Sequence, residues 1–229
     1  PALTLAVLLV LVGFGFKIAA VPFHFWSPDV YEGAPTPITA FISVASKAAG
    51  FAVLVRVLLA VFPGAGMQSV LIAVSALTMT VGNVIALTQK NIKRLLAYSS
   101  IAQAGYALVG VAAFSQAGIA AVIFYLAMYT LTNLTAFGVV ILISRVTGSD
   151  EIADYAGLSR RAPGLALAFM VALLSLGGMP PLAGFFGKFF AFAAAVQQGV
   201  AQNNSWLIWL AVIGVLNAIV GLYYYLTVL

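Results

Sequence analysis

The sequence SLGGMPPLAGFFGKF, residues 175–189, interrupts an apolar run that extends from residue 163 to residue 197. Five of its glycines and prolines lie close together, at Gly177, Gly178, Pro180, Pro181 and Gly184. They predict a broken helix, because proline removes a backbone donor and clashes with the preceding turn. The run is also too long for one straight crossing, which needs about 20 residues. We therefore expect two half-helices in line, with a non-helical segment at membrane depth.

The whole chain has the composition of a membrane protein. Of its 229 residues, 64% are hydrophobic and only 7% are charged, against about 25% charged in an average soluble domain. Apolar stretches long enough to span a bilayer occur at about 2–22, 37–61, 69–88, 95–113, 118–144, 163–197 and 205–229. The sequence predicts an all-α polytopic membrane protein with about seven transmembrane helices, two of them broken, in a single transmembrane domain.

The charges of the connecting segments predict an orientation. The connections 23–36, 89–94 and 145–162 contain the basic residues Lys90, Lys93, Arg94, Arg145, Arg160 and Arg161. The other connections, 62–68, 114–117 and 198–204, contain no charged residue, although Arg56 lies near their face of the membrane. By the positive-inside rule the first set faces the cytoplasm. The net charge of +5 is therefore spread over loops, and nucleic-acid binding is not indicated.

A short surface helix is expected in the charged connection that follows residue 144. Ser149, followed by Asp150 and Glu151, has the pattern of a helix start. From sequence alone, this segment is interpreted as a solvated connector.

The first apolar stretch predicts a second broken helix. It continues through Lys17 to Pro22 and becomes polar only at Ser27. Broken helices at membrane depth occur where the freed backbone faces protein or water, and in transporters they mark ion sites; a simple packing kink is the alternative. A broken helix with a lysine, followed by a continuous helix, occurs at 1–61 and again at 163–229. This order is that of inverted repeats.

Three lysines lie inside apolar stretches: Lys17, Lys47 and Lys188. A charge near the bilayer centre costs about 2.5–3.5 kcal/mol, so each lysine needs water or a partner, unless it extends to the interface. A buried lysine can take and give a proton near neutral pH. All the acids, Asp29, Glu32, Asp150, Glu151 and Asp154, lie in predicted connections. We expect the anionic partner of at least one lysine to lie outside residues 1–229.

Polar side chains within the stretches form a candidate proton relay. They are Ser99, Ser100, Gln103, Tyr125, Thr130 and Asn133; the alternative for serine and threonine is a bond to a carbonyl of their own helix. His24 can pass protons at the cytoplasmic mouth or be a satisfied interface histidine. The chain has no cysteine and one histidine, so the sequence predicts no metal site.

Four stretches together resemble a known family. They are the stretch quoted above, PFHFWSPDVYEGAPTPITAFISVASK at 22–47, NIKRLLAYSSIAQAGY at 91–106 and GLYYYL at 221–226. They are similar to the antiporter-like membrane subunits of respiratory complex I (NADH–quinone oxidoreductase), within them the subunit N group. The resemblance covers nearly the whole chain. The same family is related to subunits of multisubunit sodium/proton antiporters.

The resemblance implies a fold of about fourteen helices in inverted five-helix repeats, each with a broken helix. This chain would then be a fragment of a longer subunit, from about the seventh to the thirteenth helix, as its first residue Pro1 and its apolar last residues also suggest. Lys17 matches the lysine of the first broken helix, Lys47 the connecting lysine and Lys188 that of the second broken helix. The family's glutamate would lie upstream of Pro1. Some relatives place a histidine near Gln103, and a glutamine cannot titrate.

The implied function is redox-driven proton translocation in a bacterial inner membrane or an organellar energy-converting membrane. Electron transfer from NADH to quinone elsewhere would change the protonation of Lys17, which passes a proton to Lys47, and Lys188 delivers it toward the outer face. NADH, FMN, iron–sulfur clusters and quinone would be bound by partner subunits, since this chain has no dinucleotide fingerprint and no cluster cysteines. The implied partners are the other membrane-arm subunits, the bilayer, protons and water.

Two other functions fit the same composition. A subunit of a multisubunit sodium/proton antiporter would exchange ions without an electron donor. In a structural membrane scaffold, the lysines would be paired and never change charge. An enzyme that acts alone on a soluble substrate is disfavoured, because no nucleophile and base occur together in the sequence.

Overall fold

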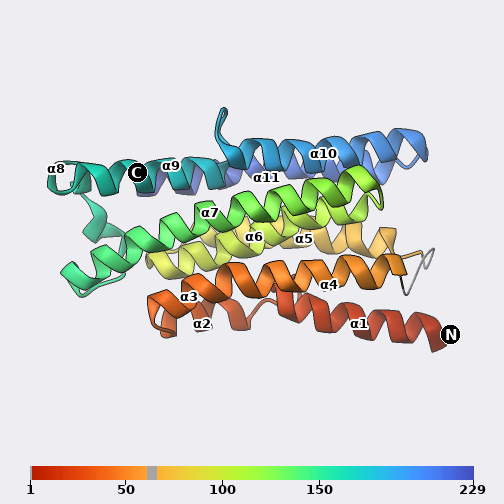
Figure 1. Cartoon of the computed structure of the whole chain (residues 1–229), viewed down its shortest axis with the longest axis horizontal. Coiled ribbons are helices and arrows are strands. Elements are labelled where there is room, and N and C mark those ends of the chain that lie inside the picture. Colours follow the sequence, from red (N-terminus) through yellow and green to blue (C-terminus); the bar gives the residue numbers. More distant parts are fainter. Residues whose placement is uncertain (1, 61–65) are drawn as a thin grey trace.

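The structure, a computed structural model, describes residues 2–60 and 66–229, and every regular element within them is helical. The elements are α1 (Ala2–Ile18), α2 (Trp26–Gly33), α3 (Thr36–Phe41), the π-helix η1 (Ile42–Ser46), α4 (Lys47–Ala60), α5 (Gln68–Ala86), α6 (Ile92–Ala112), α7 (Gln116–Thr147), the 3-10 helix η2 (Ile152–Tyr155), α8 (Leu158–Arg161), α9 (Pro163–Gly177), α10 (Ala183–Ala201) and α11 (Ser205–Val228). The long helices run side by side along one axis (Figure 1). The all-α class is confirmed.

Five segments are each long and apolar enough to cross a membrane: Thr36–Ala60, Gln68–Ala86, Ile92–Ala112, Gln116–Thr147 and Ser205–Val228. Two further crossings are divided, one between α1 and α2 and the other between α9 and α10, and the halves of each lie end to end (Figure 1). The two divided crossings run in opposite directions. The chain is an integral membrane protein, and five of the expected spans correspond to these helices, whereas the expected span 2–22 is only the first half of a divided crossing.

The two ends of the bundle differ in charge. We call the end with the loops after α2, α5 and α7 the charged end, and the end with the loops before α5, α7 and α11 the uncharged end. Every acidic residue lies near the charged end, at Asp29, Glu32, Asp150, Glu151 and Asp154, whereas the loops of the uncharged end contain no charged residue. In Figure 1 the charged end is on the left.

Helix α6 is the centre of the bundle, because nearly all of its residues are buried. It lies against α5 at two glycines. A Cβ on Gly82 of α5 would be 2.7 Å from the backbone nitrogen of Ala102, and a Cβ on Gly105 of α6 would be 2.7 Å from that of Met79. Such close approach is possible only without side chains, as is common between membrane helices. The polar residues of α6 are therefore held in a closely packed core.

The break after α1 is stabilised by neighbouring side chains. Ala19 has a left-handed backbone with φ of 58°, and the peptide bond before Pro22 is cis. The freed backbone N–H of Val21 donates to Thr78 Oγ1 of α5 at 3.0 Å, and Trp26 Nε1 donates to the Phe16 carbonyl at 2.9 Å. Backbone groups released at membrane depth are thus paired within the protein, as the bilayer requires.

The interpretation of residues 23–36 as a simple connection was wrong. Most of this segment is helix α2, with Tyr31 buried against α6 and Asp29 and Glu32 turned outward. Both carboxylates bind Arg94 at the start of α6, at 2.9 and 2.7 Å. The polar sequence concealed a helix because its charges are neutralised by a residue far along the chain.

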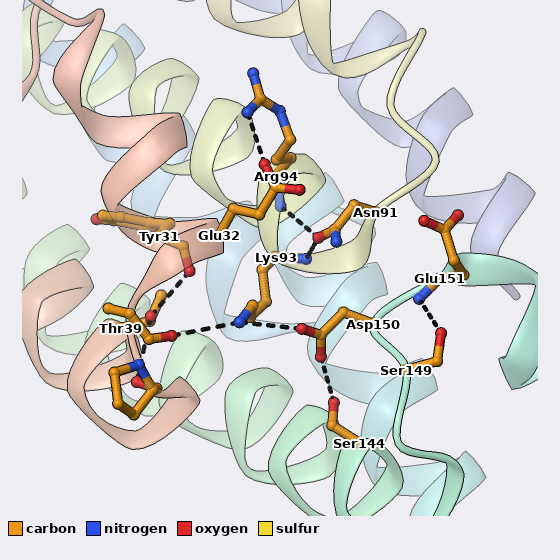
Figure 2. A network of polar contacts seen from close by, with 12 residues as sticks. Tyr31, Glu32, Thr39, Asn91, Lys93, Arg94, Ser144, Ser149, Asp150 and Glu151 are labelled. Carbon is orange, nitrogen blue, oxygen red and sulfur yellow. Dashed lines mark hydrogen bonds and ion pairs between the residues drawn. The ribbon is translucent and has the colours of Figure 1, made fainter.

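A polar cluster at the charged end holds the segment after α7 in place; it consists of Lys93, Arg94, Ser144 and Asp150 with the acids of α2 (Figure 2). Lys93 Nζ lies 3.0 Å from Asp150, which also accepts from Ser144 Oγ at 2.6 Å. The backbones of residues 90–92 and 150–152 are joined by two hydrogen bonds of 2.8 and 2.9 Å. The cluster therefore links α2, α6 and α7.

The predicted helix start at Ser149 was wrong. Its side chain accepts a hydrogen bond from the backbone of Glu151 at 3.1 Å, but the first helical turn begins at Ile152. Residues 150–152 are extended because they pair with the backbone before α6. The short helices η2 and α8 follow.

Candidate functional site

Lys47 lies in the interior, at the junction of η1 and α4. Its side chain is 3% exposed, and its Nζ donates to the Ser100 carbonyl at 2.6 Å and also to Ser100 Oγ. The Ser100 hydroxyl in turn bonds Tyr31 Oη at 3.2 Å. A π-turn inserts an extra residue into a helix and often occurs at functional sites. Here the π-helix directly precedes the lysine and sets the register of the side chain that faces α6.

Lys188 is held by the broken end of α9. It is 4% exposed, and its Nζ donates to the carbonyls of Leu176 and Gly177 at 2.8 and 3.0 Å. The Tyr106 ring lies beneath it, with Nζ 4.5 Å from the ring centroid. The last carbonyls of a helix have no partner within it and form its negative end. The break thus provides two backbone carbonyls for a cation site, and the face of the Tyr106 ring completes it.

The geometry of the second break follows from its sequence. Gly178 ends α9 with a left-handed backbone, φ 87°, and the bond between Pro180 and Pro181 is cis. The backbone N–H groups of Gly178 and Met179 both donate to the Leu174 carbonyl at 3.0 Å, which closes the helix as a glycine C-cap does. The carbonyls of Leu176 and Gly177 remain free to bind Lys188. The predicted break at Gly177, Gly178, Pro180 and Pro181 is confirmed.

Gln103 connects Lys188 to the centre of α6. Its Nε2 donates to the Leu176 carbonyl at 2.9 Å and to Tyr225 Oη at 3.2 Å, and its Oε1 accepts from the Tyr125 hydroxyl. Tyr225 also bonds Ser99. A hydrogen-bonded chain therefore extends from Lys188, through the Leu176 carbonyl, Gln103 and Tyr225, to Ser99.

The contacts of the two lysines meet at neighbouring residues of α6. Lys47 contacts Ser100, and the chain from Lys188 ends at Ser99. Within the described residues, no hydrogen bond joins these two hydroxyls directly. Asn133 donates to Ser43 Oγ at 2.7 Å, while its Oδ1 and the Tyr129 hydroxyl one turn earlier are buried with no hydrogen-bond partner in the described part of the chain. Buried polar atoms of this kind are where proteins hold water.

Three other residues that the sequence predicts for the site lie outside these hydrogen-bonded connections. Lys17 lies in the last turn of α1 with an exposed side chain, and the ion pairs of the described residues do not include it. His24 is 4% exposed in the first break, and its Nδ1 has no hydrogen-bond partner among the described residues. Thr130 donates to the Leu126 carbonyl of its own helix at 2.8 Å, as the alternative reading expected.

The expectation that a lysine would use a carboxylate does not apply to Lys47 or Lys188. Both use carbonyl and hydroxyl oxygens, because the bundle brings a helix end and a serine to them. For Lys17, an anionic partner outside residues 1–229 stays a prediction.

Sequence reasoning missed several polar residues of the site. Tyr31 and Tyr225 hold the serines, and Tyr106 lies under Lys188. The Tyr106 hydroxyl accepts from Asn83 Nδ2 at 3.0 Å, and Asn83 also bonds Asn217 at 3.2 Å. Asn83 could have been identified from the sequence, because an asparagine within an apolar membrane helix needs a hydrogen-bond partner on another helix.

A cavity of about 240 Å³ adjoins Lys188 between α10 and α11. Its walls include Gly178, Phe185, Phe192, Ile219 and Leu222. Its volume exceeds that of several waters, and Lys188 is the one polar side chain among the described residues that line it. In the described part of the chain, no group of three or more histidine, cysteine, aspartate or glutamate residues is placed to hold a metal ion.

Comparison with known proteins gives a consistent family assignment. Residues 1–220 match the family model described as "NADH:quinone oxidoreductase/Mrp antiporter, TM". The chain is 52% identical over 231 residues to NADH-quinone oxidoreductase subunit N of Heliobacterium modesticaldum, with 100% of this chain and 48% of the relative covered. It is 51% identical to NAD(P)H-quinone oxidoreductase subunit 2 of Nostoc punctiforme, with 99% and 41% covered. The chain thus spans about half the length of these curated relatives.

Solved structures are similar over nearly the whole chain. A chain of respiratory complex I from Thermus thermophilus with bound aureothin has a TM-score of 0.84 at 45% identity, with 99% of this chain and 48% of that chain covered. A chain of the Mrp complex from Dietzia sp. DQ12-45-1b has a TM-score of 0.89 at 29% identity, with 98% and 41% covered. The arrangement of the crossings is therefore similar to that of these membrane-complex chains.

Proposed function

We propose, from the premise that this chain belongs to the NADH:quinone oxidoreductase/Mrp antiporter transmembrane family, that it is part of a proton-translocating subunit of an NADH–quinone oxidoreductase. Its role is to move protons across the membrane while other subunits transfer electrons from NADH to quinone. The subunit would be longer than this chain, which would form about its seventh to thirteenth helices. Identity of about 50% to quinone oxidoreductase subunits supports this class.

The observation on which the proposal depends is the buried chain between two lysines. Lys47 and Lys188 are both buried, and both bind neutral oxygens rather than carboxylates. A neutral acceptor does not fix a lysine in its charged form as firmly as a carboxylate does. A lysine in such a site can therefore lose and regain a proton as the charges around it change.

Each residue then has a stated task. Lys188 exchanges protons with water in its cavity, and water carries them to the hydroxyls of Tyr225 and Ser99, because the Leu176 carbonyl accepts from both Lys188 and Gln103 and has no proton to pass on. Tyr225 can donate and accept in the same step, because a phenol has one proton and free lone pairs. Gln103 does not titrate, and it positions Tyr225 and the Leu176 carbonyl. Lys47 continues the path through Ser100, with water between the serines.

Lys17 is placed to receive protons from outside this chain. Its exposed side chain projects from the end of α1, at the first break. A carboxylate from the rest of the subunit would pair with it, and a change in that pair would shift the proton on Lys47. His24 remains a candidate for proton entry at the same break.

The redox groups would belong to partner subunits. NADH, FMN, iron–sulfur clusters and quinone have no recognition motif in this sequence. The partners proposed are the other membrane-arm subunits and the lipid bilayer, in a bacterial inner membrane or an organellar energy-converting membrane. A sodium/proton antiporter subunit is the rival class. It is less well supported, because the identity to the Mrp chain is 29%, lower than the identity of about 50% to the quinone oxidoreductase subunits.

The test is proton uptake driven by NADH in sealed vesicles that contain the intact enzyme. Lys188→Leu should abolish coupled uptake while artificial electron acceptors are still reduced, once equal assembly has been verified. The matched control is Lys90→Leu, at an exposed position of the charged end. Uptake by Lys188→Leu equal to that of the control would support a scaffold, and uptake driven by a sodium gradient without NADH would support an antiporter.

A further inference from the structure

Arg56 is a cation at the otherwise uncharged end of the bundle. It is exposed near the end of α4, the helix that begins at Lys47 in the interior. All acidic residues of the chain lie near the opposite end, and the ion pairs of the described residues do not include Arg56. No role in the proton path involves this side chain. An exposed arginine near the end of a membrane helix is available to bind an anion from its surroundings.

An apolar groove of about 650 Å³ extends between α4 and α7, and Arg56 lies on its α4 wall, one turn before the helix ends at Ala60. Phe51, Val55 and Leu59 form one wall, and Val122, Ile123 and Leu126 form the other. Apart from Arg56 and Thr130, every residue that lines it is apolar. Clefts of about 300–1,000 Å³ are the size that binds one small ligand.

The length of the groove matches one leaflet of a bilayer. At about 1.5 Å per residue, the α7 wall from Ile119 to Thr130 is about 16 Å long. This is half of a hydrocarbon core of about 30 Å. Along α4 the groove ends at Ala48, next to the buried Lys47, so its inner end lies near the depth of the proton path.

We propose that this groove is a binding site for one anionic phospholipid of the leaflet at the uncharged end. Its phosphate binds the Arg56 guanidinium, and an acyl chain fills the groove between α4 and α7. Arginine suits a phosphate because its planar fork donates two parallel hydrogen bonds. A quinone tail would fill the apolar part without offering an anion. A polypeptide segment would satisfy Arg56 only by placing a carboxylate beside it, and in that case the lipid probe below would not label the groove.

The test uses the intact enzyme in nanodiscs with a trace of phosphatidylglycerol that has a diazirine on its acyl chain. After irradiation, mass spectrometry of peptides should find the label on residues 119–130 and 48–60. Arg56→Gln should lower this labelling about fivefold, since one basic residue near a membrane surface contributes about 1 kcal/mol of attraction to anionic lipid. Arg145→Gln, which alters an exposed cation at the charged end, should leave it unchanged.

A second variant tests whether the groove itself is needed, with the charge of Arg56 left unchanged. Ala127→Phe, at an exposed position of the α7 wall, should fill the groove and reduce labelling while Arg56 is intact. Three results would each overturn the proposal: equal labelling with a phosphatidylcholine probe, labelling that does not depend on Arg56, or no label in the groove because another protein segment covers it.

Discussion

Gly184 is the position at which one methyl group should disable the second break. A Cβ at this residue would lie 1.8 Å from the Ser175 carbonyl oxygen, whereas ordinary contacts begin at 3.4 Å. The start of α10 would have to move away from α9 by about 1.6 Å, the difference between these two distances. The hydrogen bond of 3.1 Å from Gly184 N to Ser175 Oγ would be lost as well.

This displacement acts directly on Lys188, which lies one turn later on the same helix. Its bond to the Leu176 carbonyl is 2.8 Å long, and N–H···O bonds are effective only to about 3.2 Å. Misplacing a functional group by about 1 Å can cost about 10²-fold in rate. Overpacking of this kind also destabilises by about 1–3 kcal/mol. Gly184→Ala should therefore lower coupled proton uptake at least tenfold, with a measurable loss of thermal stability.

The assay is proton uptake per NADH oxidised in sealed vesicles, with assembly verified on native gels. Gly138→Ala is the matched control, because a Cβ there meets no atom within 4 Å, and alanine favours a helix by up to about 1 kcal/mol. If Gly184→Ala pumps as well as Gly138→Ala, the break geometry does not position Lys188 and the reasoning fails.

Three further changes test other parts of the account. Tyr225→Phe removes the hydroxyl between Ser99 and Gln103 and should slow coupled proton uptake by about tenfold or more, as loss of a positioned proton-transfer group does. Thr78→Val leaves the Val21 N–H without its acceptor in the first break and should lower stability by about 1–3 kcal/mol, measured by thermal unfolding of the solubilised enzyme. Asp150→Asn removes the partner of Lys93 and should weaken the polar cluster by about 2 kcal/mol, so that trypsin cleaves faster at Arg160 and Arg161.

Each of these variants has a matched control. For Tyr225→Phe the control is Tyr223→Phe, which alters an exposed tyrosine. For Thr78→Val it is Thr135→Val, which alters a threonine that bonds only its own helix. For Asp150→Asn it is Asp154→Asn, which alters a carboxylate that is in no ion pair of the described residues. Equal behaviour of a variant and its control in the assay named would contradict the role assigned to that side chain.

The spans and both breaks were predictable because they depend on local sequence. Uncharged runs of bilayer length specify the crossings, and Pro22, Pro180 and the neighbouring glycines specify where helices end. Helix α2 was missed because its charges, Asp29 and Glu32, resemble those of a loop until Arg94 is brought beside them. Long-range pairing of this kind leaves no local signal.

The residues of the site were predictable in type but not in partner. A lysine in an apolar stretch indicates a functional position, which singled out Lys47 and Lys188. Their acceptors, Ser100 and the Leu176 carbonyl, are set by how α4, α6 and the break pack together. Lys17 was expected inside the protein, yet it is exposed on this chain, because burial depends on everything that surrounds α1.

The central claim is that a buried lysine changes its protonation during turnover, and Lys47 offers the most direct test. Arginine keeps a positive charge but does not release its proton near neutral pH, so Lys47→Arg separates charge from proton exchange. The measurement is the number of protons taken up per NADH by Lys47→Arg and Lys47→Leu enzymes that assemble equally. The account predicts that both variants lose coupled uptake. Full uptake by Lys47→Arg would contradict it, and would mean that the site needs only a fixed positive charge.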